Sequence, residues 1–211
     1  GAAPLTVTPT GMGSVASSPA GVTCPGTCNA TFNQSPVTLT ATAAPGWALA
    51  AWGGACAGTG STCDVIMNSA RTVSASFLQL RQLTVATTGM GQVTSNVGAI
   101  TCPGTCQANL LDGTAVTLTA AAAPGYRFDS WSLASCASTG TVCMLTADAD
   151  RSVTATFVAL ETLSVTVSSL GVGSGSVTIT PQGQAPSTCA VGTCTRQIDR
   201  GSNVTLAVTS S

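Results

Sequence analysis

The chain contains tandem copies of one segment, and this internal repeat limits the possible folds more than any other feature. Residues 5–77 and 83–157 present similar residues in the same order. The offset is 78 residues at the first leucine of each copy and 80 at the closing phenylalanine. Matching positions include Gly11/Gly89, Gly13/Gly91, Cys24/Cys102, Cys28/Cys106, Pro45/Pro124, Trp52/Trp131, Cys56/Cys136, Cys63/Cys143, Arg71/Arg151 and Phe77/Phe157. Each copy is therefore expected to fold as one structural unit.

A third, shorter copy follows the two complete ones. It opens at Leu163 with Leu-Ser-Val-Thr-Val, passes through Gly173 and Gly175, and reaches Val-Thr-Leu-Ala-Val at 204–208. Residues 161–211 contain no counterpart of the aromatic segment, the second cysteine pair or the closing strand, so we expect only the first half of a module there. The predicted modules are residues 1–79, 80–160 and 161–211.

The hydrophobic pattern within a copy has a period of two, which is typical of β-strands. Apolar and hydroxyl residues alternate from Leu5, from Val37 and from Thr72. Val and Thr favour strands because their branched Cβ fits a pleated sheet and loses rotamer freedom in a helix. Gly-x-Gly, Cys-Pro-Gly-Thr-Cys and Ala-Pro-Gly separate the strands as turns. We predict an all-β chain in which each copy forms a small antiparallel sheet of roughly five or six short strands.

Short segments connect the copies. Residues 78–82 join the first copy to the second, and residues 158–162 join the second to the third. We interpret both segments as linkers, short enough to allow semi-rigid stacking of neighbouring modules.

The aromatic residues indicate how each small module fills its core. All eight lie at repeat positions. A module of this size has few large side chains, and each aromatic ring buries about 150–250 Å². We therefore assign Trp52 and Trp131, and likewise Phe77 and Phe157, to the core.

Trp47 and Tyr126 occupy a more ambiguous position, directly after a Pro-Gly turn in each complete copy. Packing in the core or at a strand end is one interpretation, and contact with a ligand is the other. They are the best candidates in the chain for aromatic residues that face a sugar or a partner.

The ten cysteines fall into five pairs that are close in sequence. If the two pairs of a copy bonded to each other, Cys189 and Cys194 would lack partners in this chain, so we favour local bonds. Disulfides that close such short loops stabilise a small module by about 2–3 kcal/mol each in the entropy model. The predicted disulfides are Cys24–Cys28, Cys56–Cys63, Cys102–Cys106, Cys136–Cys143 and Cys189–Cys194.

Zinc binding and redox activity are the alternatives for the cysteines. Four thiolates can bind zinc, but the usual spacing is Cys-x-x-Cys, and the third copy offers only two thiols. The four pairs of the complete copies have no basic residue near them that would lower a thiol pKa. We therefore predict no metal and no cofactor, and the disulfides indicate an oxidising, extracytoplasmic compartment.

Charge is scarce: six basic and seven acidic residues occur in 211, without histidine. The lack of histidine excludes Ser-His-Asp and Cys-His catalysis, and six arginines are too few for a face that binds nucleic acid. Asp148 and Asp150 could ligate calcium weakly, but a solvated turn is favoured because the other ligands of a loop site are missing. We predict that the chain is not an enzyme.

A membrane-spanning helix needs about 18 consecutive apolar residues, and no segment of the chain has them. Pro45 and several glycines interrupt the most apolar stretch, 41–56. The N-terminus also lacks the pattern of a secretory leader. We expect no membrane span.

Glycan attachment at the triplets that begin with Asn29, Asn33 and Asn203 stays open.

Two motifs connect each complete copy with a known family: a Pro-Gly turn followed by Trp before a cysteine pair, and Arg-x-Val-x-Ala-x-Phe at the close. With these motifs the chain resembles the divergent internalin-B-type B-repeat family of bacterial extracellular proteins. The resemblance covers 5–157 in full and 163–208 in part. It implies tandem β-grasp-like modules in secreted or surface-displayed proteins, where they act as stalks, spacers or adhesive segments. It implies no catalytic residues.

The pattern as a whole favours a non-catalytic structural or adhesive segment of a bacterial surface protein, a stalk or part of a fibre. The expected partners are other copies of the chain or neighbouring repeats of a larger one. The alternative is a carbohydrate-binding module of a secreted protein, which would use Trp47 and Tyr126 against surface glycans.

Overall fold

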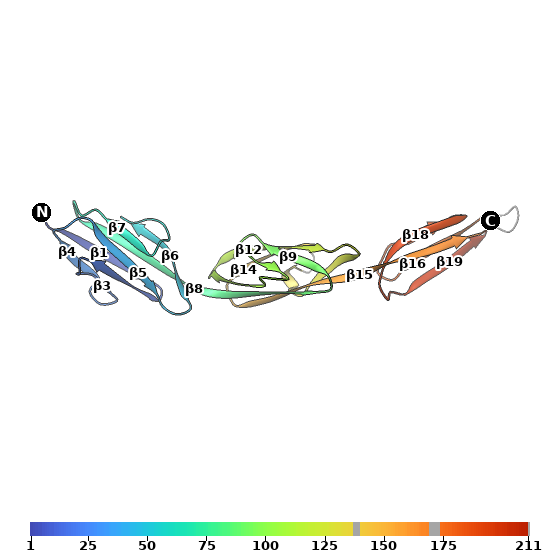
Figure 1. Cartoon of the computed structure of the whole chain (residues 1–211), viewed down its shortest axis with the longest axis horizontal. Helices are drawn as coiled ribbons and strands as arrows, with labels where there is room; N and C mark the ends of the chain where they lie inside the picture. Colours follow the sequence, from blue (N-terminus) through green and yellow to red (C-terminus); the bar gives the residue numbers. More distant parts are fainter. Residues whose placement is uncertain (137–139, 169–173, 211) are drawn as a thin grey trace. The chain divides into compact units, whose positions relative to one another are not determined.

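The structure is a computed structural model, and it describes residues 1–136, 140–168 and 174–210 (Figure 1). Gly173 of the third copy lies outside the described residues. By its internal contacts the chain divides into two compact units. Unit 1 comprises Gly1–Thr84, Gln107–Val116 and Leu145–Ser152, and unit 2 comprises Val85–Cys106, Thr117–Met144 and Val153–Ser211.

Eight strands form the first copy, more than the five or six expected. They are β1 (Ala3–Thr10), β2 (Gly13–Ser18), β3 (Thr23–Cys24), β4 (Asn29–Phe32), β5 (Val37–Ala43), β6 (Trp47–Gly54), β7 (Thr62–Val65) and β8 (Arg71–Thr88). One sheet contains β4, β1, β8 and β6, and the other contains β3, β2, β5 and β7. The first copy is therefore a sandwich of two four-stranded sheets.

The first and last strands of this copy are neighbours and run parallel. Leu5 of β1 lies opposite Arg71 of β8, and Val7 lies opposite Val73. The other pairings of the copy are antiparallel, as predicted. The parallel pair departs from that prediction because six intervening strands, rather than a hairpin, connect β1 to β8.

The core of the first copy lies between its two sheets. Inward-facing residues of both sheets are fully buried there, among them Leu5 and Val73 from one sheet and Val15 and Leu39 from the other. The predicted core aromatics are confirmed: Trp52 is 5% exposed and Phe77 1%. Their second-copy counterparts Trp131 and Phe157 are 5% and 3% exposed.

The second copy repeats these elements. They are β9 (Gly91–Ser95), β10 (Thr101–Cys102), β11 (Gln107–Leu111), β12 (Thr114–Ala122), β13 (Tyr126–Trp131), the 3₁₀ turn η1 (Ala134–Cys136), β14 (Val142–Ala147) and β15 (Arg151–Val167). β11 pairs with β8, β13 with β15, and β9 with both β10 and β12, all antiparallel. The all-β prediction is confirmed, and the β-grasp-like modules implied by the resemblance contain no α-helix among the described residues.

The third segment adds β16 (Gly175–Pro181), β17 (Ser187–Cys189), β18 (Gly192–Asp199) and β19 (Val204–Ser210). β18 pairs antiparallel with residues 160–167 of β15. β16 lies between β17 and β19 in a separate three-stranded sheet. These strands correspond in order to the first five strands of a complete copy.

No loop separates one copy from the next. β8 continues unbroken for 18 residues from the end of the first copy into the second, and β15 continues for 17 residues from the second into the third (Figure 1). The interpretation of 78–82 and 158–162 as linkers is therefore wrong. In both segments the backbone keeps strand pairing although no side chain is fully buried, so the alternating pattern fades while the strand persists.

Candidate functional site

All ten cysteines form disulfides, each with its neighbour in sequence. The bonded pairs are Cys24–Cys28, Cys56–Cys63, Cys102–Cys106, Cys136–Cys143 and Cys189–Cys194. Three of them begin in β3, β10 and β17, each an edge strand of its sheet. The other two close the loop between the last aromatic strand of a copy and the strand that follows.

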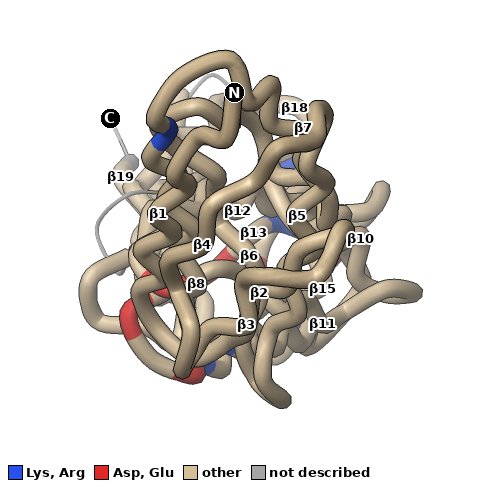
Figure 2. Tube along the Cα trace, turned by 90° about the vertical axis from the view of Figure 1, so that its left-hand side faces the viewer, with Lys and Arg blue, Asp and Glu red and all other residues tan. Residues whose placement is uncertain are grey.

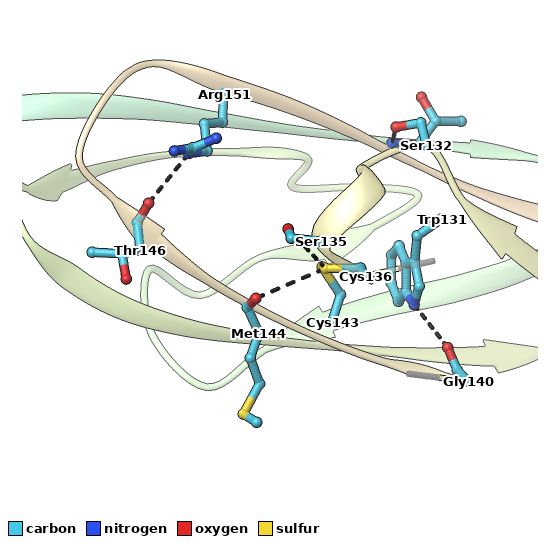
Figure 3. Close-up of a disulfide and its surroundings, with 10 residues drawn as sticks. Trp131, Ser132, Ser135, Cys136, Gly140, Cys143, Met144, Thr146 and Arg151 are labelled. Carbon is cyan, nitrogen blue, oxygen red and sulfur yellow. Dashed lines mark hydrogen bonds between the residues drawn. A yellow bond between two sulfur atoms is a disulfide. The ribbon is translucent and has the colours of Figure 1, made fainter. Parts of the chain in front are cut away.

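Each of these two longer loops is also held by the core tryptophan. The indole N–H of Trp52 donates to the carbonyl oxygen of Gly60 at 2.7 Å, inside the loop that Cys56 and Cys63 close. In the second copy, Trp131 donates to Gly140 at 2.9 Å (Figure 3). The tryptophan therefore fills the core with its ring and fixes the loop with its polar edge.

The arginine that opens the last strand of each complete copy is bound to its own preceding turn. Arg71 donates from Nε to the carbonyl oxygen of Ile66 at 3.1 Å, and Arg151 donates to that of Thr146 at 3.2 Å (Figure 3). Arg151 also pairs with Asp148 and holds the pKa of that carboxyl below its ordinary value through this hydrogen bond. Both arginines therefore bond groups of their own turn.

Asp148 and Asp150, the possible calcium ligands, have different partners. Asp148 binds Arg151, whereas the carboxylate of Asp150 accepts a hydrogen bond from the backbone N–H of Gln82 at 2.8 Å. The two carboxylates therefore bind groups of the turn and of the neighbouring strand. Among the described residues, no three His, Cys, Asp or Glu side chains gather closely enough to hold a metal.

Trp47 and Tyr126, the candidate ligand-facing aromatics, open β6 and β13 and are half-buried. Trp47 packs against the core of the first copy, and its ring approaches within 3.1 Å of the place where a Cβ on Gly11 would stand. Tyr126 lies opposite Ala159 of β15. Both positions therefore combine packing with a partly accessible ring.

A shallow groove recurs near this position in both complete copies. In the first it has a volume of about 530 Å³ and lies between Met12 and Pro25. In the second it has a volume of about 500 Å³ and lies between the matching residues Met90 and Pro103. Both methionines are more than half exposed, and none of the described residues that line either groove is charged. Neither groove therefore offers a charged side chain to a ligand.

The joint between the first and second copies is fixed by backbone and ionic contacts. The N–H of Leu80 donates to the carbonyl oxygen of Gly46 at 2.8 Å, and the N–H of Asp112 donates to that of Gln79 at 2.8 Å. Arg81 of β8 forms an ion pair with Asp112 at 2.6 Å. These contacts hold the middle of β8 between a turn of the first copy and a turn of the second.

The joint between the second and third copies has the same plan with the charges exchanged. The N–H of Leu160 donates to Gly125, and the N–H of Arg200 donates to Ala159, both at 2.8 Å. Here the strand carries the acid, because Glu161 pairs with Arg200 at 2.8 Å. Glu161 corresponds to Arg81, and Arg200 to Asp112, in the alignment of the copies.

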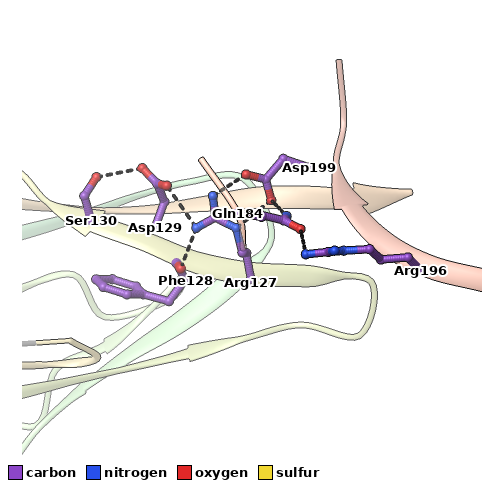
Figure 4. A network of polar contacts seen from close by, with 7 residues as sticks. All are labelled: Arg127, Phe128, Asp129, Ser130, Gln184, Arg196 and Asp199. Atoms are coloured by element: carbon purple, nitrogen blue, oxygen red, sulfur yellow. Dashed lines mark hydrogen bonds and ion pairs between the residues drawn. The ribbon is translucent and has the colours of Figure 1, made fainter. Parts of the chain in front are cut away.

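A second ion pair strengthens this later joint. The guanidinium of Arg127 in β13 binds both carboxylate oxygens of Asp199 at the end of β18, and it also contacts Asp129 at 3.0 Å (Figure 4). The hydrogen bond to Asp199 raises the pKa of Arg127 above its ordinary value. The same bond lowers the pKa of Asp199. Both groups are therefore held in their charged forms.

The sequence reasoning did not identify these joint residues. A signal was available: Figure 2 shows how few charged segments the trace contains, and eight of the 13 charged residues contact a joint. These eight are Arg81, Asp112, Arg127, Asp129, Asp150, Glu161, Asp199 and Arg200. In a chain this poor in charge, charges concentrated at copy boundaries indicate contacts between copies.

The described part of the chain has no helix that is long and apolar enough to cross a membrane. A comparison with curated proteins found no match. The sequence profile of a family described as the divergent InlB B-repeat domain matches residues 3–80 and residues 81–161. These two tandem matches coincide with the two complete copies and cover most of the chain. The chain therefore belongs to the divergent InlB B-repeat domain family.

Proposed function

We propose that the chain is a non-catalytic, extracellular structural segment of a bacterial surface protein, and that its repeats resist tension. The observation that supports this role best is the parallel pairing of β1 with β8 in the first copy. A segment of a stalk or fibre is pulled along the chain. The strands that receive the force are then the first and the last strand of each copy.

The geometry of this pair favours resistance to pulling. In two neighbouring parallel strands, the start of one and the end of the other lie at opposite ends of the pair. Tension then slides the strands along each other, and it strains the hydrogen bonds between Leu5↔Arg71 and Thr10↔Ser76 together. Antiparallel hairpins pulled from their open end lose their hydrogen bonds one at a time, which needs less force.

The joints support the same role. Because β8 and β15 pass from one copy to the next without a loop, tension leaving one copy enters the first strand of the following copy directly. The Arg81–Asp112 and Glu161–Arg200 ion pairs lie at these passages. A flexible linker would add extensible length at each passage instead.

The disulfides support an extracytoplasmic location. Bonds of this kind persist in oxidising compartments and are rare in the cytosol. Two tests follow on the producing cells. Antibodies should label the chain on intact cells, and its ten cysteines should react with a thiol reagent only after reduction. A cytosolic chain with free thiols would contradict the proposal.

The mechanical role is tested by pulling single molecules from their two ends. We expect discrete unfolding events, each from a complete copy, at forces well above those that open a hairpin. Extension without such events would contradict the role. The partners that suit it are further repeats of the same kind, either in a longer chain or in other copies of this one.

Carbohydrate binding is the second candidate. The uncharged groove beside the Gly-Met-Gly turn recurs in both complete copies, near the half-buried Trp47 and Tyr126. Neutral sugars bind to aromatic and apolar surfaces with a few polar groups. Replacing both residues with alanine should abolish retention on surface polysaccharides if this function holds. Unchanged retention of the double variant, or no retention of the wild type, would dispose of it.

A further inference from the structure

The third segment presents an apolar face that the complete copies cover. In the first copy, β5 lies between β2 and β7, and its Leu39 is fully buried. The matching strand β19 pairs with β16 alone in the described part of the chain. On β19, Leu206 is 52% exposed and Val208 is 78% exposed. These side chains therefore point toward a layer that other residues supply in the complete copies.

The first strand of the third segment is open in the same way. Residues 163–167 of β15 pair with β18, as β1 pairs with β4. In the first copy the other edge of β1 holds β8. Within the described ranges no strand takes that place beside 163–167, whose inward-facing residues are half-buried while Leu5 and Val7 are buried.

A glycine marks where the missing layer would dock. A Cβ on Gly13 would stand 2.5 Å from the ring of Phe77, and a Cβ on Gly91 would stand 2.5 Å from the ring of Phe157. In each complete copy the ring of the closing phenylalanine thus packs directly on this glycine. Gly175 is the matching residue, and among the described residues a Cβ there would meet only the carbonyl oxygen of Thr209, at 3.3 Å.

We propose that this face binds one extended segment with the pattern Arg-x-Val-x-Ala-x-Phe. The segment lies parallel to residues 163–167, and its phenylalanine ring covers Gly175. The two complete copies give the register: because Leu5 faces Arg71 and Val7 faces Val73, the arginine of the segment lies opposite Leu163 and its valine opposite Val165. The segment is a polypeptide strand and not a glycan, because the open groups are a strand edge and an aliphatic surface.

The segment also needs the residues that precede this pattern. In the first copy, Arg71 bonds to the carbonyl oxygen of Ile66 and to the side chain of Asn68, so the strand carries its own partners for the arginine. A peptide of residues 66–80 contains all of them. It has a single charged residue, and β19 has none, so little repulsion opposes docking.

The test is binding of a fluorescent peptide of sequence 66–80 to the full chain, followed by anisotropy. We expect saturable binding at one peptide per chain. Phe77→Ala in the peptide should weaken binding at least tenfold, because the ring is the largest group that docking buries. Absence of saturable binding, or equal affinity of the alanine peptide, would overturn the proposal.

A matched pair of protein variants locates the site. Gly175→Val places a side chain where the phenylalanine ring of the peptide would pack, so it should weaken peptide binding at least tenfold. Gly60→Val, whose Cβ would meet only Thr62 at 3.8 Å, should leave peptide binding unchanged. A photoreactive phenylalanine in place of Phe77 should crosslink to β16 beside Gly175. Equal binding by both variants, or crosslinks confined to the complete copies, would overturn the proposal.

Self-association is a distinct outcome. If sedimentation shows a dimer that the peptide does not dissociate, and Gly175→Val abolishes the dimer, then a second copy occupies the face and the peptide proposal is wrong. The inference builds on the structural role proposed above, but the two fail separately. Pulling experiments on the complete copies do not depend on this face, and peptide binding does not depend on mechanical strength.

Discussion

The ring of Phe77 lies directly against the α-carbon of Gly13, where an added Cβ would stand 2.5 Å from the ring. Gly13 is the first residue of β2, and Phe77 belongs to β8 in the opposite sheet. The contact joins the two sheets of the first copy at one end of the sandwich. Phe157 and Gly91 repeat it in the second copy.

This contact predicts that Gly13→Ala destabilises the first copy. The added methyl group forces the ring out of its position, and overpacking of a core costs about 1–3 kcal/mol. The free energy of unfolding is measurable in urea from the fluorescence of Trp47 and Trp52, after Trp131→Phe removes the signal of the second copy.

A double-mutant cycle separates the contact from a general effect on the strand. Phe77→Leu alone should destabilise the copy. In that background Gly13→Ala should cost less than in the wild type, because the added methyl group no longer meets the phenylalanine ring. Gly60→Ala, whose Cβ would meet only the carbonyl oxygen of Thr62 at 3.8 Å, should change stability by less than about 0.5 kcal/mol. An additive cycle would show that the ring and the glycine do not interact.

The second joint should weaken in acid. In the folded chain the hydrogen bond from Arg127 lowers the pKa of Asp199, so the unfolded state binds more protons as the pH falls. The stabilisation is therefore fully present above the unfolded pKa of about 3.9 and is lost as the pH falls through the lower folded value. Because Arg127 is partly exposed, we expect only roughly 0.2–1 kcal/mol.

Hydrogen exchange of backbone amides in β13 and β18 measures this effect locally. Between about pH 6 and about pH 2, the opening free energy of these amides should fall further in the wild type than in Asp199→Asn. Arg127→Gln should show the same reduced pH dependence as Asp199→Asn, since either change removes the pair. Parallel curves for the wild type and both variants would contradict the linkage.

The exchanged charges at the two joints predict a charge-swap rescue. Arg81→Glu places a second negative charge beside Asp112 and should destabilise the first joint by about 0.5–1 kcal/mol. Adding Asp112→Arg recreates the order found at Glu161 and Arg200 and should restore most of that loss. Exchange of the amides of β8 and β11 reports both steps. If the double variant is no more stable than Arg81→Glu, the pairing does not matter.

The hydrogen bonds of the core tryptophans predict a small loss of stability, confined to the loops that the longer disulfides close, when the indole N–H is removed. Trp52→Phe keeps a large ring in the core but leaves the carbonyl oxygen of Gly60 without its donor. We expect a loss of about 1 kcal/mol and faster exchange in the loop from Cys56 to Cys63. Phe77→Tyr is not a suitable control because it adds a buried hydroxyl. Trp47→Phe is the matched change outside this loop and should leave the exchange of the loop unchanged.

Much of the fold follows from local pattern. Alternation of Val and Thr predicts β5, and the position of Cys189 and Cys194 in an incomplete copy predicts local disulfides, which the structure contains. These features depend on residues near each other in sequence. Local chemistry therefore carries them without knowledge of the rest of the fold.

The contacts between distant segments could not be predicted in the same way. Alternation does not encode strand direction, so the parallel pairing of β1 with β8 left no trace in the pattern. Gly13 looked like part of a turn, although it lies in a strand and its role is to admit the ring of Phe77. The middle of β8 looked like a linker because its pairing with β6 and β11 lies outside the segment itself.

The most direct measurement compares two directions of pulling on the first copy. Force applied between residues 1 and 80 shears the parallel pair of β1 and β8, whereas force applied between residues 1 and 33 peels β1 from its antiparallel neighbour β4. At equal loading rates, the first direction should need a clearly higher unfolding force, and the alternative attachment should yield gradually at low force. Equal forces in the two directions would contradict a role in resisting tension.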